Sequence, residues 1–237
     1  MTDRMSRWAP SVLLVGAAVA ANIAFVGLGS SFEYPDILQD PARDILELFD
    51  DNRGTTMAWF GLLALGAALL APGAILLARL GQGRAAAWSA RVGVAAAIVQ
   101  VVGLSRWFVL VPDYADRALD PSSSPTQQAD AVSDFETAHE VLGTAIGETL
   151  GYTLTALWII LVIAAFPSRP TWFRVWGAIS AALIFIGVLV PLDVPGADAA
   201  NFIGYVLWSL WLVALAILLI RGRLTPAGTA PQASRPA

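Results

Sequence analysis

The sequence alternates between long apolar stretches and short segments that carry charge, proline or glycine. Six stretches are long enough to cross a bilayer, because a transmembrane helix needs about 20 apolar residues to traverse roughly 30 Å of hydrocarbon. The predicted spans are Ser11–Gly29, Thr55–Leu77, Trp88–Pro112, Gly143–Phe166, Trp172–Leu192 and Phe202–Ile220. The pattern therefore predicts an all-α integral membrane bundle of six transmembrane helices within residues 1–220. Residues 221–237 are expected to form a disordered cytoplasmic tail.

The loops on one side of the bundle contain further helical patterns. Asp40 and Pro41 suit the N-cap and the first position of a helix. Ser133 and Glu136 form a capping-box pattern, so we expect the fourth helix to begin outside the membrane. A short amphipathic helix is predicted in the first external loop, packed as a lid on the bundle or lying at the interface. Its apolar residues at helical spacing are Ala42, Ile45, Leu46 and Phe49.

Charged residues are distributed unequally between the two sides of the predicted bundle. All 14 basic residues are arginine, and most of them fall on the side that carries both termini. The loops on the other side are net acidic, although they contain Arg43, Arg53 and Arg117. Because short cytoplasmic loops retain arginine, this bias predicts an N-in, C-in topology with both termini cytoplasmic. The arginines of the predicted cytoplasmic side are Arg4, Arg7, Arg79, Arg84, Arg91, Arg169, Arg174, Arg221, Arg223 and Arg235.

The first span has an alternative interpretation as a secretory signal peptide. Arg4 and Arg7 form a basic region before it, and Ala18, Val19 and Ala20 resemble a cleavage site. Its apolar run is longer than the roughly 7–15 residues of a signal-peptide core, so a transmembrane helix is favoured.

Composition limits the class of protein and the chemistry it can support. With 57% hydrophobic and 14% charged residues, the chain of 237 residues is too apolar for a soluble domain. The absence of cysteine and lysine excludes disulfides, thiolate metal sites and Schiff bases on a lysine, and no cofactor is predicted. Nucleic acid is not an expected partner, because the net charge is −4 and the arginines are scattered. The expected partners are the lipid bilayer and a small-molecule or lipid ligand.

Polar side chains inside the spans are candidates for function, because an ionisable group at the bilayer centre costs at least about 2.5–3.5 kcal/mol. In the fourth helix, five polar residues recur at steps of four or three and therefore share one α-helical face. They are Glu140, Thr144, Glu148, Tyr152 and Thr155. Gly143, Gly147 and Gly151 form a ridge of small residues beside this face, which predicts that another helix approaches closely.

The third span brings a second set of polar residues to a similar depth. Gln100 and Arg106 share one face of this helix, and Arg106 lies at the same depth as Glu148. We therefore expect an ion pair between Arg106 and Glu148, hydrogen-bonded to Tyr152. Tyr205 in the sixth span extends the polar set toward the outside. The pair either fixes helix register or lines a ligand cavity, and the sequence leaves both interpretations open.

Metal and catalytic chemistry have little support in the sequence. His139 is the single histidine, whereas a metal site needs three or four converging ligands. Glu148 follows nine residues later, about 180° around an ideal α-helix, so it cannot share an ion with His139. Ser105 follows a glycine-x-serine pattern, but the histidine lies on another helix. We predict no catalytic residues and no metal site.

Four segments, taken together, resemble a known family. They read Phe32-Glu33-Tyr34-Pro35-Asp36-Ile37-Leu38, Gly103-Leu104-Ser105-Arg106-Trp107, Gly147-Glu148-Thr149-Leu150-Gly151-Tyr152 and Gly204-Tyr205-Val206-Leu207-Trp208. The combination is similar to bacterial six-span proteins grouped as domain of unknown function 4386, over nearly the whole chain. The resemblance implies a multi-pass bacterial membrane protein without an assigned activity, and we expect it in the plasma (inner) membrane. It implies no catalytic or binding residues.

These observations favour a bundle that binds a small or lipid-like ligand in an outward-facing polar pocket, as a sensor or accessory protein. The pocket is predicted around Arg106, Glu148 and Tyr152. A small-solute transporter is the first alternative, although transport favours discontinuous helices and midplane sites. An intramembrane hydrolase that uses His139 is the second, and a structural partner protein is a further possibility. The predicted polar network also includes Gln100, Thr144, Glu140 and Tyr205.

Overall fold

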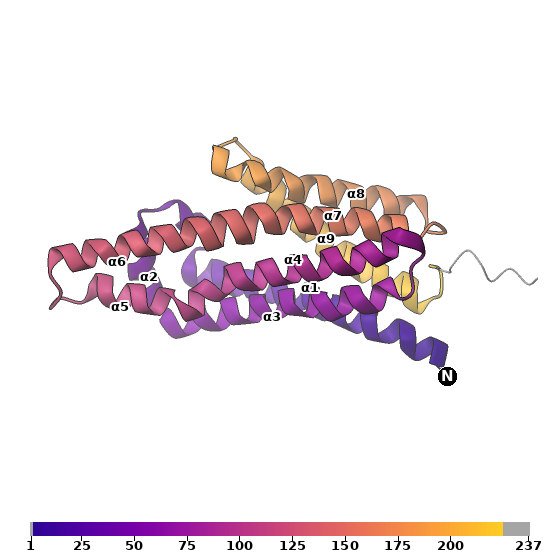
Figure 1. The fold of residues 1–237 in the computed structure, drawn as a ribbon, viewed down its shortest axis with the longest axis horizontal. Helices are drawn as coiled ribbons and strands as arrows, with labels where there is room; N and C mark the ends of the chain where they lie inside the picture. Colours follow the sequence, from indigo (N-terminus) through magenta and orange to yellow (C-terminus); the bar gives the residue numbers. More distant parts are fainter. Residues whose placement is uncertain (1, 225–237) are drawn as a thin grey trace, which may run out of the picture.

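The described part of the chain is helical throughout. The computed structural model describes residues 2–224, with side chains from Ser6 onward (Figure 1). In this range six helices are long and apolar enough to cross a membrane, which confirms the predicted all-α bundle of six spans. The predicted tail lies outside the described residues from position 225 onward. The elements are α1 (Thr2–Phe32), η1 (Asp36–Gln39), α2 (Ala42–Asp51), α3 (Arg53–Ala78), α4 (Gly83–Val109), α5 (Val111–Leu119), α6 (Pro125–Ala138), η2 (His139–Leu150), α7 (Gly151–Ala165), α8 (Thr171–Ile186), η3 (Gly187–Leu192) and α9 (Ala197–Ile220).

Two spans extend further than the apolar pattern predicts. The third runs through α4 and α5 for 37 residues, and the fourth runs through α6, η2 and α7 for 41 residues. Both exceed the about 20 residues that cross the hydrocarbon core. The fourth helix begins at Pro125 rather than near Ser133, because Ser124 and Gln127 form the capping box. The hydroxyl of Ser124 accepts the N–H of Gln127, and the side-chain oxygen of Gln127 accepts the N–H of Ser124.

The projecting ends of α5 and α6 pack against each other and against α2 (Figure 1). Helix α2 buries Ile45, Leu46 and Phe49, which are the apolar residues at helical spacing in the sequence. These side chains join an apolar cluster that contains Trp107 and Phe135 from the third and fourth spans. The segment after α1 therefore covers one end of the bundle with a packed helix.

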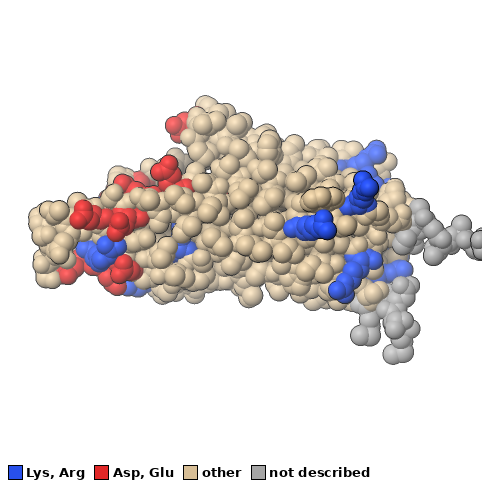
Figure 2. Space-filling model, in the orientation of Figure 1, with Lys and Arg blue, Asp and Glu red and all other residues tan. Residues whose placement is uncertain are grey.

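Charge is segregated along the long axis of the molecule. Figure 2 shows acidic side chains gathered at the end formed by α5 and α6, arginines at the opposite end, and uncharged surface between them. Arg53 and Arg117 belong to the acidic end, where they form ion pairs with Asp116 and Asp134. The first and last described residues both lie at the arginine end (Figure 1). That the arginine end faces the cytoplasm stays a prediction from the positive-inside rule.

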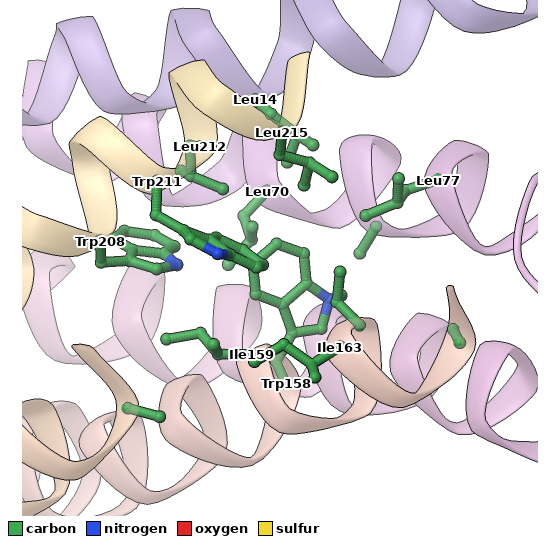
Figure 3. Packing of buried hydrophobic residues seen from close by; sticks show 14 of the residues in the cluster. Leu14, Leu70, Leu77, Trp158, Ile159, Ile163, Trp208, Trp211, Leu212 and Leu215 are labelled. Carbon is green, nitrogen blue, oxygen red and sulfur yellow. The ribbon is translucent and has the colours of Figure 1, made fainter. Parts of the chain in front are cut away.

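An apolar core fills the half of the bundle nearer the arginine end (Figure 3). Trp211 stacks on Phe173 with ring centroids 4.7 Å apart, and Trp158 meets Trp211 edge-on at 6.4 Å. The indole N–H of Trp211 donates to the Phe173 carbonyl at 3.0 Å. Small residues admit these rings, since a Cβ at Gly93 would lie 2.6 Å from the indole nitrogen of Trp158. This half is packed for stability.

Candidate functional site

Five of the residues predicted from sequence line one cavity of about 120 Å³ in the half of the bundle nearer the acidic end. We call it the inner cavity. Helix α4 contributes Gln100 and Arg106, the fourth span contributes Glu148 and Tyr152, and α9 contributes Tyr205. Three spans that are distant in sequence therefore bring their polar residues to one space. In lipid such residues gather inside the bundle, because facing hydrocarbon costs several kcal/mol.

Arg106 is buried beside the inner cavity, with only 5% of its surface exposed. Its Nη1 donates to the carbonyl of Gly103 at 2.6 Å, and its guanidinium carbon lies 5.0 Å from the ring centroid of Trp107. Its Nε has no hydrogen-bond partner in the protein. The side chain is thus fixed in place by its own helix, and it forms no ion pair within 4.0 Å with a described carboxylate.

The predicted direct ion pair between Arg106 and Glu148 is wrong. Among the ion pairs within 4.0 Å found for the described residues, those at the acidic end join Arg43, Arg53 and Arg117 to nearby carboxylates, and none joins Arg106 to Glu148. The guanidinium lies against Gly143 instead, where an added Cβ would be 2.7 Å from Nη2. Both charges face the inner cavity without touching.

The backbone of the fourth span changes its hydrogen-bond register beside the cavity. Residues His139–Leu150 form a π-helix of 12 residues, whose i→i+5 hydrogen bonds widen each turn. The sequence was interpreted with α-helical spacing, and this difference moves residues around the helix. Glu140, predicted to belong to the polar network, is exposed and lines neither of the two cavities described here.

A ridge of glycines holds the π-helix against α4. A Cβ added to Gly103 would lie 2.7 Å from the Cα of Gly147 and 2.8 Å from the carbonyl oxygen of Leu142. A Cβ added to Gly151 would lie 3.3 Å from the side chain of Gln100. The close approach expected from the glycine spacing is therefore present, and α4 is the helix that uses it.

The inner end of the site is closed by a small hydrogen-bonded group. The amide nitrogen of Gln100 donates to the hydroxyl of Thr155 at 3.1 Å and to that of Tyr205 at 3.3 Å. The ring of Tyr205 contacts that of Tyr152, with centroids 5.8 Å apart. Gln100, Tyr152 and Tyr205 were predicted from sequence to belong together, and the structure places them side by side.

A second and larger cavity of about 550 Å³ adjoins the first, and we call it the outer cavity. The two share Tyr34, Glu148, Tyr152 and Tyr205 among their lining residues. The outer cavity extends between α1 and α9 toward the acidic end. Thr144, another residue predicted from sequence, lines this cavity. All residues of the predicted polar network except Glu140 therefore border one cavity or the other.

The residues around both cavities fall inside a segment that matches a family model. The model for the family described as domain of unknown function (DUF4386) matches residues 11–224. The chain belongs to this family. The match confirms the resemblance inferred from the sequence segments. No curated protein and no solved structure matches the chain.

In this DUF4386 protein the π-helix also moves His139 to the cavity. His139 and Glu148 were predicted to lie on opposite faces of an ideal α-helix, yet both line the outer cavity. The wider turns of the π-helix bring positions nine apart closer to one face. His139 packs against the rings of Trp107 and Phe135, and its Nδ1 has no protein partner. An α-helical register would have kept the two residues on opposite faces.

Tyr34 is the functional candidate that sequence reasoning missed. It lies in the short segment after α1, lines both cavities, and meets Phe60 edge-on with ring centroids 5.5 Å apart. Burial raises the pKa of Tyr34 to about 12, so its hydroxyl stays protonated at neutral pH. The available signal was a tyrosine followed directly by proline at the end of a span, which by itself indicates only that the helix ends.

Proposed function

We propose that this protein is a multi-pass protein of the bacterial plasma membrane that binds a small or lipid-like ligand in the two adjoining cavities. The observation that carries the proposal is Arg106, which is buried beside a cavity and forms no ion pair within 4.0 Å with a described carboxylate. Leaving such a charge in a membrane protein costs several kcal/mol unless a group with complementary charge approaches it. A bound ligand supplies that group, and the protein then acts as a sensor or accessory protein.

Other unpaired donors around the inner cavity support this proposal. Trp107 and Trp208 line it, and in both the indole N–H is buried without a protein partner. Buried polar groups in native proteins are nearly always hydrogen-bonded to protein, water or a ligand. Together with the Nε of Arg106, these donors favour a ligand group rich in hydrogen-bond acceptors.

The direction of the cavities supports an outward-facing site. The outer cavity reaches Asp36 and Asp198, which lie in the net-acidic segments at the end away from the described chain termini. The positive-inside rule assigns that end to the outside of the cell, with both termini in the cytoplasm. Reporter fusions after Gly81 and after Ser168 test this, and an external signal from either would reverse the site's orientation.

The core toward the arginine end favours binding over transport. Trp158, Phe173 and Trp211 are fully buried in the packed core and line neither cavity. A transporter needs a second conformation in which this layer opens. The described side chains that pack around these rings in the core are hydrophobic, so they do not form a polar path for a solute. A hydrolase that uses His139 and the nearby carboxylates has less support, because Glu136 and Glu140 are exposed and line neither cavity.

Native mass spectrometry tests the proposal on protein purified in mild detergent from its host membrane. We expect the wild-type chain to retain one small or lipid-like molecule, seen as a single added mass. Arg106→Gln should lose that mass. Arg91→Gln removes an exposed arginine from the same helix and should retain it. A wild-type spectrum of bare chain, or equal retention by Arg106→Gln, would contradict the proposal.

A further inference from the structure

We infer that the ligand is an amphiphile with a zwitterionic headgroup, whose acidic group pairs with Arg106 and whose ammonium pairs with Glu148. Its hydrocarbon chain lies in the outer cavity between α1 and α9. This inference rests on the proposed binding function and adds the chemical class of the ligand and the position of its two parts.

The two charges of the inner cavity set the charge of the headgroup. Arg106 and Glu148 have opposite signs, both line this cavity, and neither forms an ion pair with a described residue. A purely anionic ligand satisfies Arg106 but leaves the carboxylate of Glu148 unpaired and repelled. A purely cationic ligand does the reverse. A zwitterion pairs with both, and a planar guanidinium suits a phosphate or carboxylate especially well.

The rim of the outer cavity agrees with this charge pattern. Asp36 and Asp198 line it and are exposed to solvent. Two carboxylates at the entrance disfavour a ligand with net negative charge and attract an ammonium. The acidic group of the ligand is therefore best accommodated deeper, at Arg106, as part of a molecule whose net charge is zero.

The sizes of the two cavities fit the two parts of such a molecule. The inner cavity has a volume of about 120 Å³. An engineered protein cavity of about 150 Å³ holds benzene, so a compact headgroup fits in a space of this size. The outer cavity, at about 550 Å³, lies within the roughly 300–1,000 Å³ of small-molecule sites. Glu148 and Tyr152 line both cavities. The phosphate of such a headgroup lies between its chain and its ammonium, so the headgroup folds back in the inner cavity to bring the ammonium to Glu148 while the phosphate reaches Arg106.

The lining of the outer cavity is suited to a hydrocarbon chain that arrives from the membrane. Asn22 donates to the hydroxyl of Ser209 at 2.9 Å, which joins α1 to α9 at one end of the cavity. Toward the acidic end, the wall is made by Val26 of α1 and by Phe202 and Val206 of α9. Val26 is 74% exposed and Phe202 is 53% exposed, so this wall belongs to the lipid-facing surface.

The hydrocarbon chain of the ligand comes from the membrane, and this determines which part of the ligand gives selectivity. A hydrocarbon chain that moves from lipid into the outer cavity gains little hydrophobic free energy, since lipid is at least as apolar as the cavity lining. Discrimination between ligands must then come from the headgroup. We therefore expect affinity to depend strongly on headgroup charge and weakly on small changes in chain length.

A headgroup series tests the charge assignment on the full-length protein in maltoside micelles. Dissociation constants are measured by native mass spectrometry for lysophosphatidylethanolamine, lysophosphatidylglycerol and a monoacylglycerol with the same chain. The wild-type protein should bind the zwitterionic lipid about 10-fold more tightly than the anionic or the neutral one. A preference for the anionic or neutral lipid, or equal binding of all three, would overturn the inference while leaving ligand binding itself established.

Two variants assign the two charges to their residues. Glu148→Gln should remove the about 10-fold preference for the zwitterionic over the anionic lipid, because the carboxylate no longer repels the latter. Glu140→Gln changes an exposed glutamate of the same π-helix and should keep the preference. If Glu148→Gln keeps the preference as well, the ammonium assignment is wrong. The wild-type headgroup series remains decisive even where a variant does not fold.

Phosphoethanolamine, the same headgroup without a chain, separates a membrane lipid from a free zwitterion as the source. It should bind at least about 10-fold more weakly than the lysolipid. Equal affinity would contradict the assignment of the outer cavity to a chain. If no member of the series binds and purified protein carries no ligand, the proposed function itself fails together with this inference.

Filling the outer cavity locates the chain directly. Val206→Trp places a large side chain in the wall of this cavity and should weaken binding of lysophosphatidylethanolamine about 10-fold. Val213→Trp, on the same helix and outside both linings, is the matched control and should leave binding unchanged. Equal effects of the two variants would place the chain elsewhere.

Discussion

The two halves of the bundle differ in what their buried tryptophans face, which is packed side chains in one half and a cavity in the other. Toward the arginine end, Trp211 stacks on Phe173 and donates its indole N–H to a carbonyl, so the ring is both packed and hydrogen-bonded. Around the cavities, Trp107 stacks on Phe60 and Trp208 is also buried, but neither indole N–H has a protein partner. The first half is packed without a cavity beside these rings, although Trp158 and Trp176 there also leave the indole N–H without a partner among the described residues. The second leaves donors and charges unmatched, as expected where a ligand completes the structure.

The largest effect that separates the halves is expected in the packed core. Trp211→Ala should lower the free energy of unfolding by about 3–5 kcal/mol, because it opens a large cavity and frees the Phe173 carbonyl. Denaturant unfolding in detergent measures the change. Tyr205→Phe, beside the cavities, removes a single hydroxyl and should cost about 0.5–1.5 kcal/mol. Similar costs for both variants would remove the distinction between the halves.

The second effect has the opposite sign. In ligand-free protein, replacing both Arg106 and Glu148 by glutamine should raise the free energy of unfolding by about 1–3 kcal/mol, because it removes two charges inside the bundle that form no ion pair within 4.0 Å. The same unfolding measurement applies. Arg91→Gln, at an exposed position, should stay within about 0.5 kcal/mol of wild type. A loss of stability in the double variant would mean that the folded protein already stabilises both charges.

The third effect concerns the contact that frames the inner cavity. Gly103→Ala should destabilise the bundle by about 1–3 kcal/mol, because the added methyl group would meet the backbone of Gly147 at 2.7 Å. Gly61→Ala is the control, since nothing lies within 4 Å of a Cβ there, and helix propensity should make it neutral or slightly stabilising. If the two substitutions behave alike in thermal unfolding, α4 and the π-helix are further apart than described.

The smallest effect is expected at the acidic surface. Asp116→Asn removes one partner of Arg53, and the carboxylate of Asp116 is 64% exposed. Exposed ion pairs contribute about 0.2–1 kcal/mol, and salt screens them further. The difference in thermal unfolding between variant and wild type should therefore be small at low ionic strength and vanish near 1 M salt. A loss above about 2 kcal/mol that persists in salt would mean that this surface contributes to the folded core.

Much of the candidate site was predictable because the membrane restricts where charge can lie. Arg106, Glu148 and Tyr152 stand out in sequence since few polar residues occur inside the spans, and the structure brings them to one cavity. The predicted contact between Arg106 and Glu148 is absent, and the depth of the two residues in the membrane does not explain why. The guanidinium is held by Gly103 and Gly143, so matched depth did not become contact.

Residue spacing could not predict that His139 lines the cavity and Glu140 does not. Both residues lie at the start of the π-helix, and an i→i+5 register rather than i→i+4 decides which of them lines the cavity. Tyr34 was missed for a related reason. It belongs to a connecting segment, where no periodicity indicates which way a side chain points.

The sequence by itself determined the number of spans, the separation of arginine from acidic residues, and the identity of most polar residues in the bundle. These properties depend on apolar length and on the cost of charge in lipid, which are set position by position along the chain. The tertiary structure alone decided the hydrogen-bond register of the fourth span, the separation of Arg106 from Glu148, and the shape of the cavities. These three features depend on the surface that each helix packs against, such as the contact of Gly103 with Gly147. A surface made by two distant segments exists only after those segments have packed.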